Sequence, residues 1–319
     1  MGERSMDSLL TLKGVKISFI TDEGDVRAAW DINLNLEKGK IFGLIGETGC
    51  GKSVIAHAIL RLLPENAQVS GEIIYKGENL GILSAKAIRK IRGKEIGLIA
   101  QNPSEALNPL LTNGYQVTEA ICRHRNFSRQ EGWKVAESIL RELDIPEPER
   151  RMTEYPHQLS GGMKQRILTA IGIGGSPALL IADEPTKGLD ALIRGQVVDV
   201  LSKLVSATGT TIFLITHDLQ VAAKLCDQVA VMYAGEIIEQ GKTAKLFSKP
   251  RHPYLRGLLA SLPENGLNSL KGSSPSLINL PAGCRFQERC NQAAQACMVI
   301  SPLFKQIAED HKVRCHSID

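Results

Sequence analysis

The order of hydrophobic and polar residues along the chain predicts an alternating α/β protein. Short apolar runs stand at Lys40–Ile45, Ala178–Ala182 and Thr211–Ile215, and stretches with helical spacing lie between them. Continuous apolar runs of this length are typical of strands that are buried on both faces. We therefore expect a mostly parallel sheet covered by helices.

A different pattern, typical of an antiparallel hairpin, lies between Asp227 and Gly241. The segment VAVMY is followed by Ala234 and Gly235 and then by EIIEQG. A short turn with glycine between two apolar strands favours a tight hairpin. We expect this hairpin at the edge of the sheet, so the fold should include antiparallel edge strands.

Two stretches interrupt the alternation. The chain is richer in charge from Asn102 to about Leu159, which predicts an inserted helical subdomain at about residues 102–170. The composition shifts to Ser, Pro, Asn and Gly from Ser261 to Gly283, which is typical of a linker. We therefore expect a main domain at residues 1–262, and a linker with a C-terminal extension at residues 263–319. The residues that fit one helix face in the insertion are Trp133, Val135, Ala136, Ile139, Leu140 and Leu143.

The first candidate site is the octapeptide GETGCGKS, which fits the pattern G-x-x-x-x-G-K-[ST]. An apolar strand precedes it and an apolar helix follows it, which is the context that identifies a phosphate-binding loop. Backbone N–H groups at a helix N-terminus favour an anion, the lysine would reach the β- and γ-phosphates, and the serine would bind Mg²⁺. The residues of this loop are Gly46, Glu47, Thr48, Gly49, Cys50, Gly51, Lys52 and Ser53.

A second candidate follows the apolar run ALLIA. The run ends in two carboxylates, Asp183 and Glu184, where a strand terminus beside a phosphate loop would place them. Asp183 suits Mg²⁺ through a water molecule, and Glu184 suits polarising the attacking water as a general base. Solvated acids at the end of a strand are the alternative interpretation.

A third candidate is the segment LSGGMKQ, from Leu159 to Gln165. Ser160 is a good helix N-cap, and Gly161 and Gly162 let backbone amides approach an anion closely. This is a second phosphate-binding helix start in a chain whose first loop already holds a nucleotide. A single site has no need of both.

Along the chain the phosphate loop comes first, LSGGMKQ second and the paired carboxylates third. With these motifs the sequence resembles the ATP-binding cassette (ABC) family, whose signature is LSGGQ. Residue 163 is Met here, and Gln165 follows two positions later, a variant familiar among peptide importers. The resemblance covers nearly the whole chain. It implies a P-loop ABC ATPase core at residues 1–262, and two such cassettes that pair head to tail around ATP.

The resemblance also implies roles for three further residues. Gln101 matches the glutamine that contacts the metal, the water and the membrane subunit. His217 matches the switch histidine, which would bond the γ-phosphate and orient Glu184. Asp190 matches an aspartate that bridges the two subunits, although Lys187 and Gly188 beside it are unusual for the family.

Cassettes of this family stack the adenine on an aromatic side chain ahead of the phosphate loop. Phe19 is the first candidate here, and Tyr75 and Trp30 are the alternatives. Plain core packing of Phe19 is the interpretation without a ligand.

Several stretches more narrowly resemble the ATPase subunits of oligopeptide, dipeptide and nickel importers. They are QNPSEALNPLLTNGYQVTEAI, EYPHQLSGGMKQR, RHPYLRGLLASLP and the closing GCRFQERC with its later cysteines. The first of these, from Gln101 to Ile121, lies where the coupling helix of the membrane subunit would dock.

The C-terminal extension has a chemistry of its own, because four of the seven cysteines lie in it with the spacing C-x5-C-x6-C-x17-C. In a cytosolic protein such clustering favours a metal over disulfides. The paired C-x2-C pattern of zinc sites is absent, whereas an irregular loop with four thiolates can hold a 4Fe-4S cluster. The resemblance to importer ATPases also implies such a cluster. Zinc, and free thiols or an incidental disulfide, stay as alternatives. The cysteines are Cys284, Cys290, Cys297 and Cys315.

These observations predict an ATPase subunit that drives the uptake of di- or oligopeptides, with nickel or another metal chelate as the alternative solute. The implied partners are a second cassette, either a copy or a paralogue, two membrane permease subunits and, indirectly, an extracytoplasmic solute-binding protein. A soluble ABC-type ATPase that acts on nucleic acid or the ribosome is the rival from another class. It is disfavoured because there is one cassette and no long coiled coil. A redox sensor with vestigial ATPase is disfavoured because every catalytic position is filled.

Charge and hydropathy limit the setting of the protein. The chain has 38 Lys and Arg against 34 Asp and Glu, a balance too even to argue for nucleic acid. It has no apolar run of the roughly 18 residues that span a membrane, and the segment MGERSMDSLLTLKG lacks the apolar region of a signal peptide. We expect a peripheral protein at the cytoplasmic face of the cell membrane.

Overall fold

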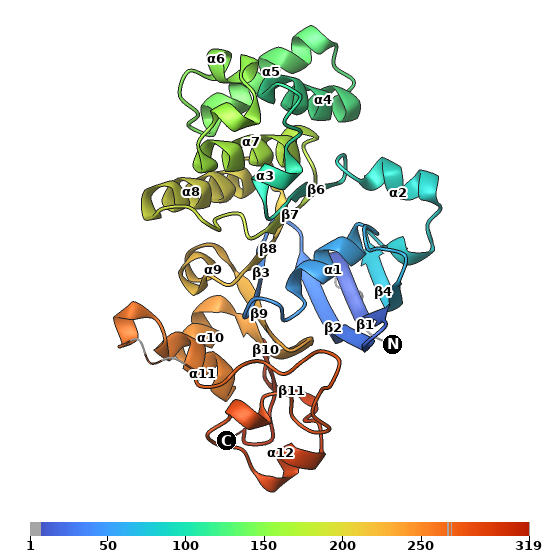
Figure 1. The fold of residues 1–319 in the computed structure, drawn as a ribbon, viewed down its shortest axis with the longest axis vertical. Helices are drawn as coiled ribbons and strands as arrows, with labels where there is room; N and C mark the ends of the chain where they lie inside the picture. Colours follow the sequence, from blue (N-terminus) through green and yellow to red (C-terminus); the bar gives the residue numbers. More distant parts are fainter. Residues whose placement is uncertain (1–7, 267, 269, 319) are drawn as a thin grey trace. The chain divides into compact units, whose positions relative to one another are not determined.

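The computed structural model describes residues 8–266, 268 and 270–318, and these form two compact units (Figure 1). The signal-peptide prediction rests partly on residues 1–7, which lie outside the described residues. One unit holds Met1–Leu36, Phe42–Gly81 and Ile215–Asp319, and the other holds Glu37–Ile41 and Ile82–Leu214. The second unit is therefore almost one continuous segment, whereas the first is assembled from separate parts of the chain.

The first unit contains two groups of paired strands. One group is antiparallel and has the order β2-β1-β4-β5, and the other has the order β11-β12-β10-β9-β3. Within the second group β3 and β9 are parallel, and the remaining pairs are antiparallel. The sheets are thus mixed, as predicted. The strands are β1 (Ser8–Thr21), β2 (Gly24–Glu37), β3 (Ile41–Ile45), β4 (Ala67–Tyr75), β5 (Glu78–Asn79), β9 (Gln228–Tyr233), β10 (Glu236–Lys242), β11 (Phe304–Ala308) and β12 (His311–Arg314).

Helices and short turns connect the strands of the first unit. Every residue of β3 is buried, which is why its sequence is continuously apolar. The helices are α1 (Lys52–Ile59), α9 (Leu219–Leu225), α10 (Thr243–Ser248), α11 (Pro253–Ala260) and α12 (Gln295–Val299). The 3₁₀ turns are η1 (Leu80–Ile82), η3 (Pro263–Asn265) and η4 (Gln287–Arg289).

The predicted hairpin is formed by β9 and β10, but its place at the edge of the sheet was predicted wrongly. Ala234 and Gly235 form the turn with φ angles of 44° and 85°, the left-handed pair of a type I′ turn. The C-terminal residues add two more strands, because Glu239 of β10 pairs with Val313 of β12, and β12 pairs with β11. The free edge of β10 is thereby covered.

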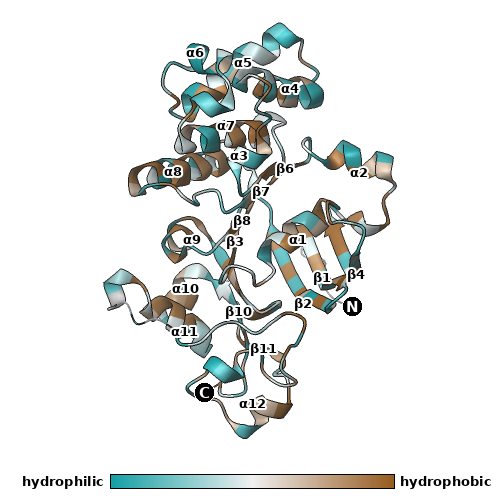
Figure 2. Ribbon diagram, viewed as in Figure 1, coloured by the Kyte–Doolittle hydropathy of each residue, from teal (hydrophilic) through white to brown (hydrophobic). Residues whose placement is uncertain are grey.

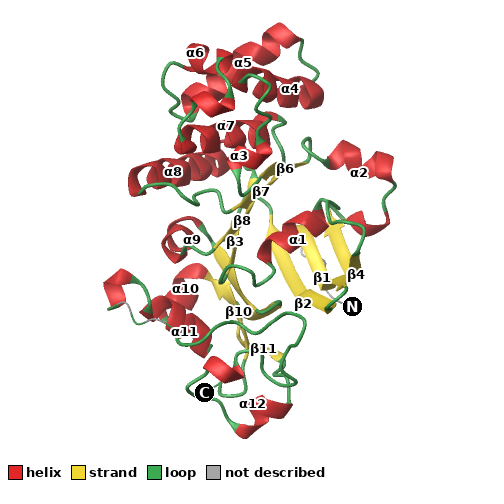
Figure 3. Cartoon of the chain, in the orientation of Figure 1, coloured by secondary structure: helices red, strands yellow, loops and turns green. Residues whose placement is uncertain are grey.

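The second unit contains three strands in the order β8-β7-β6, together with most of the helices (Figure 3). β6 and β7 are parallel, with Ile99 opposite Ala182. All five residues of β7 are buried, and Figure 2 shows this strand as apolar. The strands are β6 (Ile96–Ile99), β7 (Leu179–Asp183) and β8 (Thr211–Thr216), and the helices are α2 (Ala85–Ile91), α3 (Pro103–Ala106), α4 (Asn113–Arg125), α5 (Arg129–Glu142), α6 (Pro148–Thr153), η2 (Pro156–Gln158), α7 (Gly161–Gly174) and α8 (Ala191–Thr208).

Local signals in the sequence explain where the helices of the second unit begin. Thr112 caps α4, and Ser128 caps α5 through a complete capping box with Glu131. The apolar face predicted for residues 133–143 is the face that α5 buries, with Ala136 and Leu140 fully inside. α4 packs against both α5 and α7.

The segment predicted as a linker is fastened to the first unit. Arg27 N–H donates to the carbonyl of Leu277 at 2.9 Å, and Ser274 Oγ donates to Glu47 at 2.7 Å. Residues 270–278 therefore run along the first unit as a bound strap. Within the described part of the chain, no helix combines the length and the apolar character needed to cross a membrane.

Candidate functional site

The predicted phosphate loop connects β3 to α1 in the first unit. α1 begins at Lys52, and Gly51 before it has a φ of 105°, which favours glycine. A Cβ atom on Gly51 would lie 1.9 Å from the carbonyl oxygen of Ala28. Only glycine fits there, and the loop leads directly into a helix start, where an anion is favoured.

Lys52 is folded into this loop. Its side chain donates hydrogen bonds to the carbonyls of Gly46 at 2.8 Å and Glu47 at 2.9 Å, and the residue is buried. Cys50 lies beside it, and burial raises the pKa of this thiol. The thiol of Cys50 is therefore kept neutral.

Glu47 carries the negative charge of the loop. Its carboxylate forms an ion pair with Arg289 and accepts a hydrogen bond from Ser274. Burial alone would raise the pKa of Glu47, but the hydrogen bonds and charge of Arg289, together with Ser274, outweigh it and lower the pKa. The carboxylate is therefore ionised.

The two candidate acids lie at the carboxyl end of β7 in the second unit. Asp183 and Glu184 are both buried. Glu184 adopts a φ of 49°, a backbone conformation that is uncommon outside glycine and that gathers at functional sites. The positive φ of Glu184 is a feature that its sequence position did not reveal.

Gln101 lies close to these acids in the pattern of strands. β6 ends at Ile99, which is opposite Ala182, so Gln101 and Asp183 follow the carboxyl ends of neighbouring parallel strands. The next residue, Asn102, caps α3 by accepting from Ser104 N–H at 3.1 Å. The structure thus brings Gln101, Asp183 and Glu184 to one edge of the sheet in the second unit.

The signature segment and Asp190 begin two helices of the same unit. Ser160 caps α7 by accepting from Met163 N–H at 3.4 Å, and Asp190 caps α8 by accepting from Ile193 N–H at 2.9 Å. The two helix starts are neighbours, since a Cβ on Gly162 would meet the side chain of Ile193 (Figure 1). Ser160, Gly161 and Asp190 are exposed, so this surface is accessible to another molecule.

His217 follows β8, and Asp218 after it caps α9. His217 is exposed and belongs to the first unit, with the phosphate loop, whereas Glu184 belongs to the second. The predicted meeting of His217, the loop and the acids therefore stays a prediction.

The adenine candidates differ in burial. Phe19 lies in β1 opposite Ala67 and is half-buried. Trp30 is half-buried beneath the cationic ends of Lys16 and Arg27. Tyr75 is buried in the core, which leaves it no free ring face for a base. The structure favours Phe19 or Trp30 over Tyr75.

The four cysteines of the extension line one small cavity in the first unit, together with His252 and Phe286. The cavity measures about 10 Å³, and all four thiols are free. Burial, with a smaller contribution from the neighbouring cysteines, raises the pKa of Cys284 to about 11. In the part of the chain that the structure describes, no group of three or more His, Cys, Asp or Glu is arranged to hold a single metal ion.

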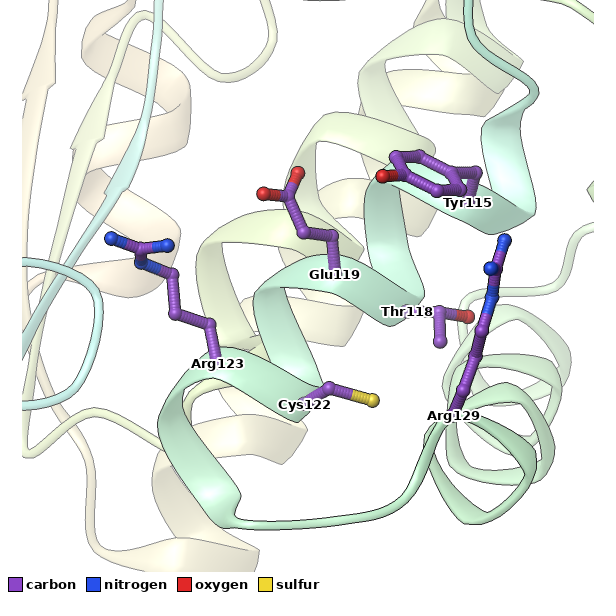
Figure 4. A pocket seen from close by; sticks show the side chains of 6 residues that line it. All are labelled: Tyr115, Thr118, Glu119, Cys122, Arg123 and Arg129. Atoms are coloured by element: carbon purple, nitrogen blue, oxygen red, sulfur yellow. The ribbon is translucent and has the colours of Figure 1, made fainter.

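A separate pocket of about 380 Å³ lies in the helical part of the second unit (Figure 4). Tyr115, Glu119 and Arg123 project from α4, and Arg129 of α5 lies 5.2 Å from the ring of Tyr115. None of the nucleotide candidates lines this pocket. Three of its lining residues, Tyr115, Thr118 and Glu119, belong to the region predicted to dock the membrane subunit.

Three contacts of Glu47 were missed by the sequence analysis. Arg289 and Ser274 bind its carboxylate, and Tyr254 Oη accepts its backbone N–H at 3.0 Å. Tyr254 and Arg289 stand in segments that resemble the importer subfamily, RHPYLRGLLASLP and GCRFQERC. That resemblance draws attention to the two segments, but it assigns no function to Tyr254 or Arg289.

Comparison with known proteins agrees with these motifs. The family described as ABC transporter matches residues 30–187, and the family described as oligopeptide/dipeptide transporter, C-terminal region, matches residues 238–297. A probable peptide ABC transporter ATP-binding protein of Sinorhizobium fredii is 42% identical, over 97% of this chain and 95% of its own length. The oligopeptide transport ATP-binding protein OppD of Bacillus subtilis is 41% identical, over 96% of this chain and 88% of its own length.

Solved structures share the fold. A dimeric ATP-binding cassette, MJ0796, in a post-hydrolysis state bound to ADP and phosphate, is 28% identical with a TM-score of 0.67. The alignment covers 73% of this chain and 98% of that one. The cassette cbiO1 of Clostridium perfringens, part of a cbiONQ transporter complex, has a TM-score of 0.64 at 27% identity, over 76% of this chain and 92% of that one.

Proposed function

The chain belongs to the ABC transporter family, and from this premise we propose that it is the ATP-hydrolysing subunit of an importer of di- or oligopeptides. The observation that carries the proposal is the combination, in one chain, of the nucleotide motifs with the C-terminal region of oligopeptide/dipeptide transporters. A cassette acting on nucleic acid or the ribosome has no use for that region.

We assign the chemistry of ATP to the candidate residues as follows. Lys52 and the loop amides bind the phosphates, and Ser53, Asp183 and Gln101 hold Mg²⁺, which supplies charge neutralisation at the β- and γ-phosphates. Glu184 polarises the attacking water, and His217 bonds the γ-phosphate. Phe19 stacks on the adenine. The buried carboxylates at the carboxyl end of β7 support the assignment of Asp183 and Glu184.

We assign Ser160, Gly161, Gly162 and Asp190 to the contact with a second cassette, either a copy or a paralogue. These residues stand at two adjacent, exposed helix starts. In this assignment the N-terminus of α7 binds the γ-phosphate of an ATP that is held by the phosphate loop of the partner. Closing of the two cassettes would then move the permeases.

We place the chain at the cytoplasmic face of the membrane, against two permease subunits and in indirect contact with a solute-binding protein. The stretch from Gln101 to Ile121 is the proposed docking region. Leu110 within it is strongly exposed, and the pocket beside Tyr115 adds a recess (Figure 4). An exposed leucine and a recess are features that suit the binding of a short helix of a membrane subunit.

The domain division proposed for this function is a cassette at residues 1–262, with a helical subdomain at about 102–170, and an extension at 263–319. Helices α3 to α7 lie within the proposed subdomain. The extension is proposed to hold a 4Fe-4S cluster through Cys284, Cys290, Cys297 and Cys315.

The residues present agree with such a cluster in chemistry, and they constrain how it is bound. Four thiols face one cavity, and each would bind a different iron, so no close single-ion arrangement is needed. The cavity of about 10 Å³ requires the four side chains to spread when a cluster binds. A cluster would supply a covalent cross-link among four points of the extension. Zinc would need all four thiolates around one ion, and the cysteines of the described residues are not arranged in that way.

Uptake measurements test the proposed function. Cells that lack this chain should lose uptake of a radiolabelled tripeptide, and the wild-type chain should restore it. Glu184→Gln should not restore uptake, although the purified variant still binds ATP, because the glutamine cannot act as a base. Uptake of ⁶³Ni²⁺ measured in the same cells is the control.

Two results would contradict these assignments. Loss of nickel uptake with unchanged peptide uptake would favour the metal-chelate alternative. A normal rate of ATP hydrolysis by purified Glu184→Gln would show that another group polarises the water.

A further inference from the structure

We propose that Arg289, in the C-terminal extension, is a positioning residue of the ATP site that holds and neutralises Glu47 inside the phosphate loop. The inference rests on the proposed function in one respect, namely that this loop binds ATP. It assigns to the extension a direct part in nucleotide binding.

The contact between Arg289 and Glu47 is a two-pronged ion pair. Nη1 of Arg289 lies 2.8 Å from Oε2 of Glu47, and Nη2 lies 3.0 Å from Oε1. Ser274 Oγ donates to the same Oε2 at 2.7 Å. The side chain of Arg289 is 6% exposed and that of Glu47 is 29% exposed. Two parallel hydrogen bonds between planar groups fix both position and orientation.

Arg289 is itself fixed by the extension and the adjoining strap. Its Nε donates to the carbonyl of Lys271 at 3.0 Å. Its guanidinium lies 5.6 Å from the ring of Tyr233 and 5.9 Å from the ring of Phe286. The arginine therefore reaches Glu47 in one defined geometry, since its stem and its charged head are both held.

The contact extends to the lysine of the loop. The backbone N–H of Glu47 donates to Tyr254 Oη at 3.0 Å, and the carbonyl of Glu47 accepts from Lys52 Nζ at 2.9 Å. The backbone and the side chain of Glu47 are thus both anchored to C-terminal residues. Displacement of Glu47 would move a carbonyl that positions Lys52.

Charge gives the contact a second effect. A carboxylate within a loop that binds a triphosphate opposes the ligand, and Arg289 offsets that charge at hydrogen-bond distance. Without Arg289 the partly buried carboxylate would face the phosphates unpaired, which should weaken ATP binding about tenfold. The effect should be on affinity, because Arg289 holds the phosphate-binding loop and is assigned no part in activating the water.

A double-mutant cycle tests the inference. We expect Arg289→Met to weaken Mg-ATP binding about tenfold in isothermal titration calorimetry, and to raise KM for ATP with little change in kcat. In the Glu47→Gln background the same substitution should weaken binding less than about twofold, because the unpaired charge is gone. Arg289→Lys, which keeps the charge and loses the fork, should fall between wild type and Arg289→Met.

The matched control is Arg314→Met. Arg314 also joins the extension to the first unit, through Asp31 at 3.1 Å and the carbonyl of Ile237 at 3.2 Å, without contacting the loop. The Arg314→Met variant should bind ATP with the same affinity as wild type. If Arg289→Met does not fold, Arg289→Lys takes its place in the cycle. Arg289→Lys should then weaken ATP binding about threefold, and this effect should disappear in the Glu47→Gln background.

Three results would overturn the inference. Equal ATP affinity of wild type and Arg289→Met would overturn this inference and leave the proposed function standing. A loss of affinity of the same size with Glu47 and with Glu47→Gln would do the same, because it would indicate a merely structural role of Arg289. Absence of ATP binding by the wild-type chain would overturn the proposed function and this inference together.

Discussion

His252 is a fully buried imidazole that the proposed reaction does not use. Its Nδ1 accepts the backbone N–H of Tyr254 at 3.1 Å, which caps α11, and its ring lies 5.6 Å from that of Phe286. Burial, together with the charge of Arg256, lowers the pKa of His252 to about 3. The folded protein therefore keeps this histidine neutral.

A pH dependence of stability follows from that burial. In the unfolded chain His252 binds a proton below its ordinary pKa of about 6.5, whereas the folded chain does not until about pH 3. Stability should therefore be complete above about pH 6.5 and fall with decreasing pH, by about 1.4 kcal/mol at pH 5.5. The measurement is denaturant unfolding at pH 7.5 and 5.5.

His252→Asn is the variant that isolates this effect. Asparagine keeps an acceptor for the cap of α11 and removes the titration. The neighbouring pair of His311 and Glu239 is present in both proteins, so the comparison isolates position 252. An equal loss of stability in both proteins at pH 5.5 would assign the acid sensitivity to other groups.

At the residue scale, contiguous motifs were predictable and distant partners were not. Gly51 and Lys52 belong to one octapeptide whose spacing encodes its own geometry, and the structure has the predicted loop at a helix start. Arg289 is 242 residues from Glu47 in sequence. No local pattern specifies such a pair, because it arises only after the strap and the extension have folded onto the first unit.

Among the helices, α7 offers a sharp test of the proposed composite site. Its first residues are exposed, and an arginine at position 160 would add bulk and positive charge where the helix dipole is already positive. Ser160→Arg should leave ATP binding by the monomer intact and abolish both dimerisation and hydrolysis. Mixing it with Lys52→Ala should restore part of the hydrolysis, because mixed dimers have one intact site.

Ser128→Arg is the matched control for that experiment. Ser128 caps α5 in the same unit, so the substitution removes a helix cap in the same way, at a cost of about 1 kcal/mol. It should still dimerise and hydrolyse ATP. The composite site would be contradicted if no mixture of Ser160→Arg and Lys52→Ala hydrolyses ATP. This conclusion requires that mixed dimers form and that one intact site suffices for hydrolysis.

At the element scale, the strands with continuous apolar runs were predicted to within about two residues, whereas β11 and β12 were not predicted. Their sequences, FKQIA and HKVR, are short and polar. They pair because β10 presents unpaired N–H and C=O groups, and that requirement is a property of the assembled sheet.

At the scale of the whole molecule, the metal content of the purified protein tests whether the cysteine cavity binds a cluster. Protein purified without oxygen should be brown, with about four irons and four sulfides per chain if one cubane cluster binds. Cys290→Ser should bleach it and make residues 284–300 sensitive to protease, while ATP binding persists. Cys122→Ser, at a cysteine outside the cavity, is the control and should stay brown.

The outcome of that experiment separates three interpretations. Colourless protein with one zinc per chain would identify the other metal, and metal-free protein with an equally protected extension would show that the cysteines form no site. Residues 304–314 should stay protected in all cases, because β12 pairs with β10 and Val313 is buried. The pairing of β12 with β10 therefore holds this part of the extension without a metal.

The discontinuity of the first unit has a consequence for synthesis on the ribosome. β3, which leads into the phosphate loop, has β9 as its parallel partner, and nearly the whole second unit lies between them in the chain. The second unit can begin to fold as soon as its own continuous segment has emerged. The strand that supports the ATP loop must wait for its partner, so a nascent chain acquires its helical unit before it acquires the capacity to bind nucleotide.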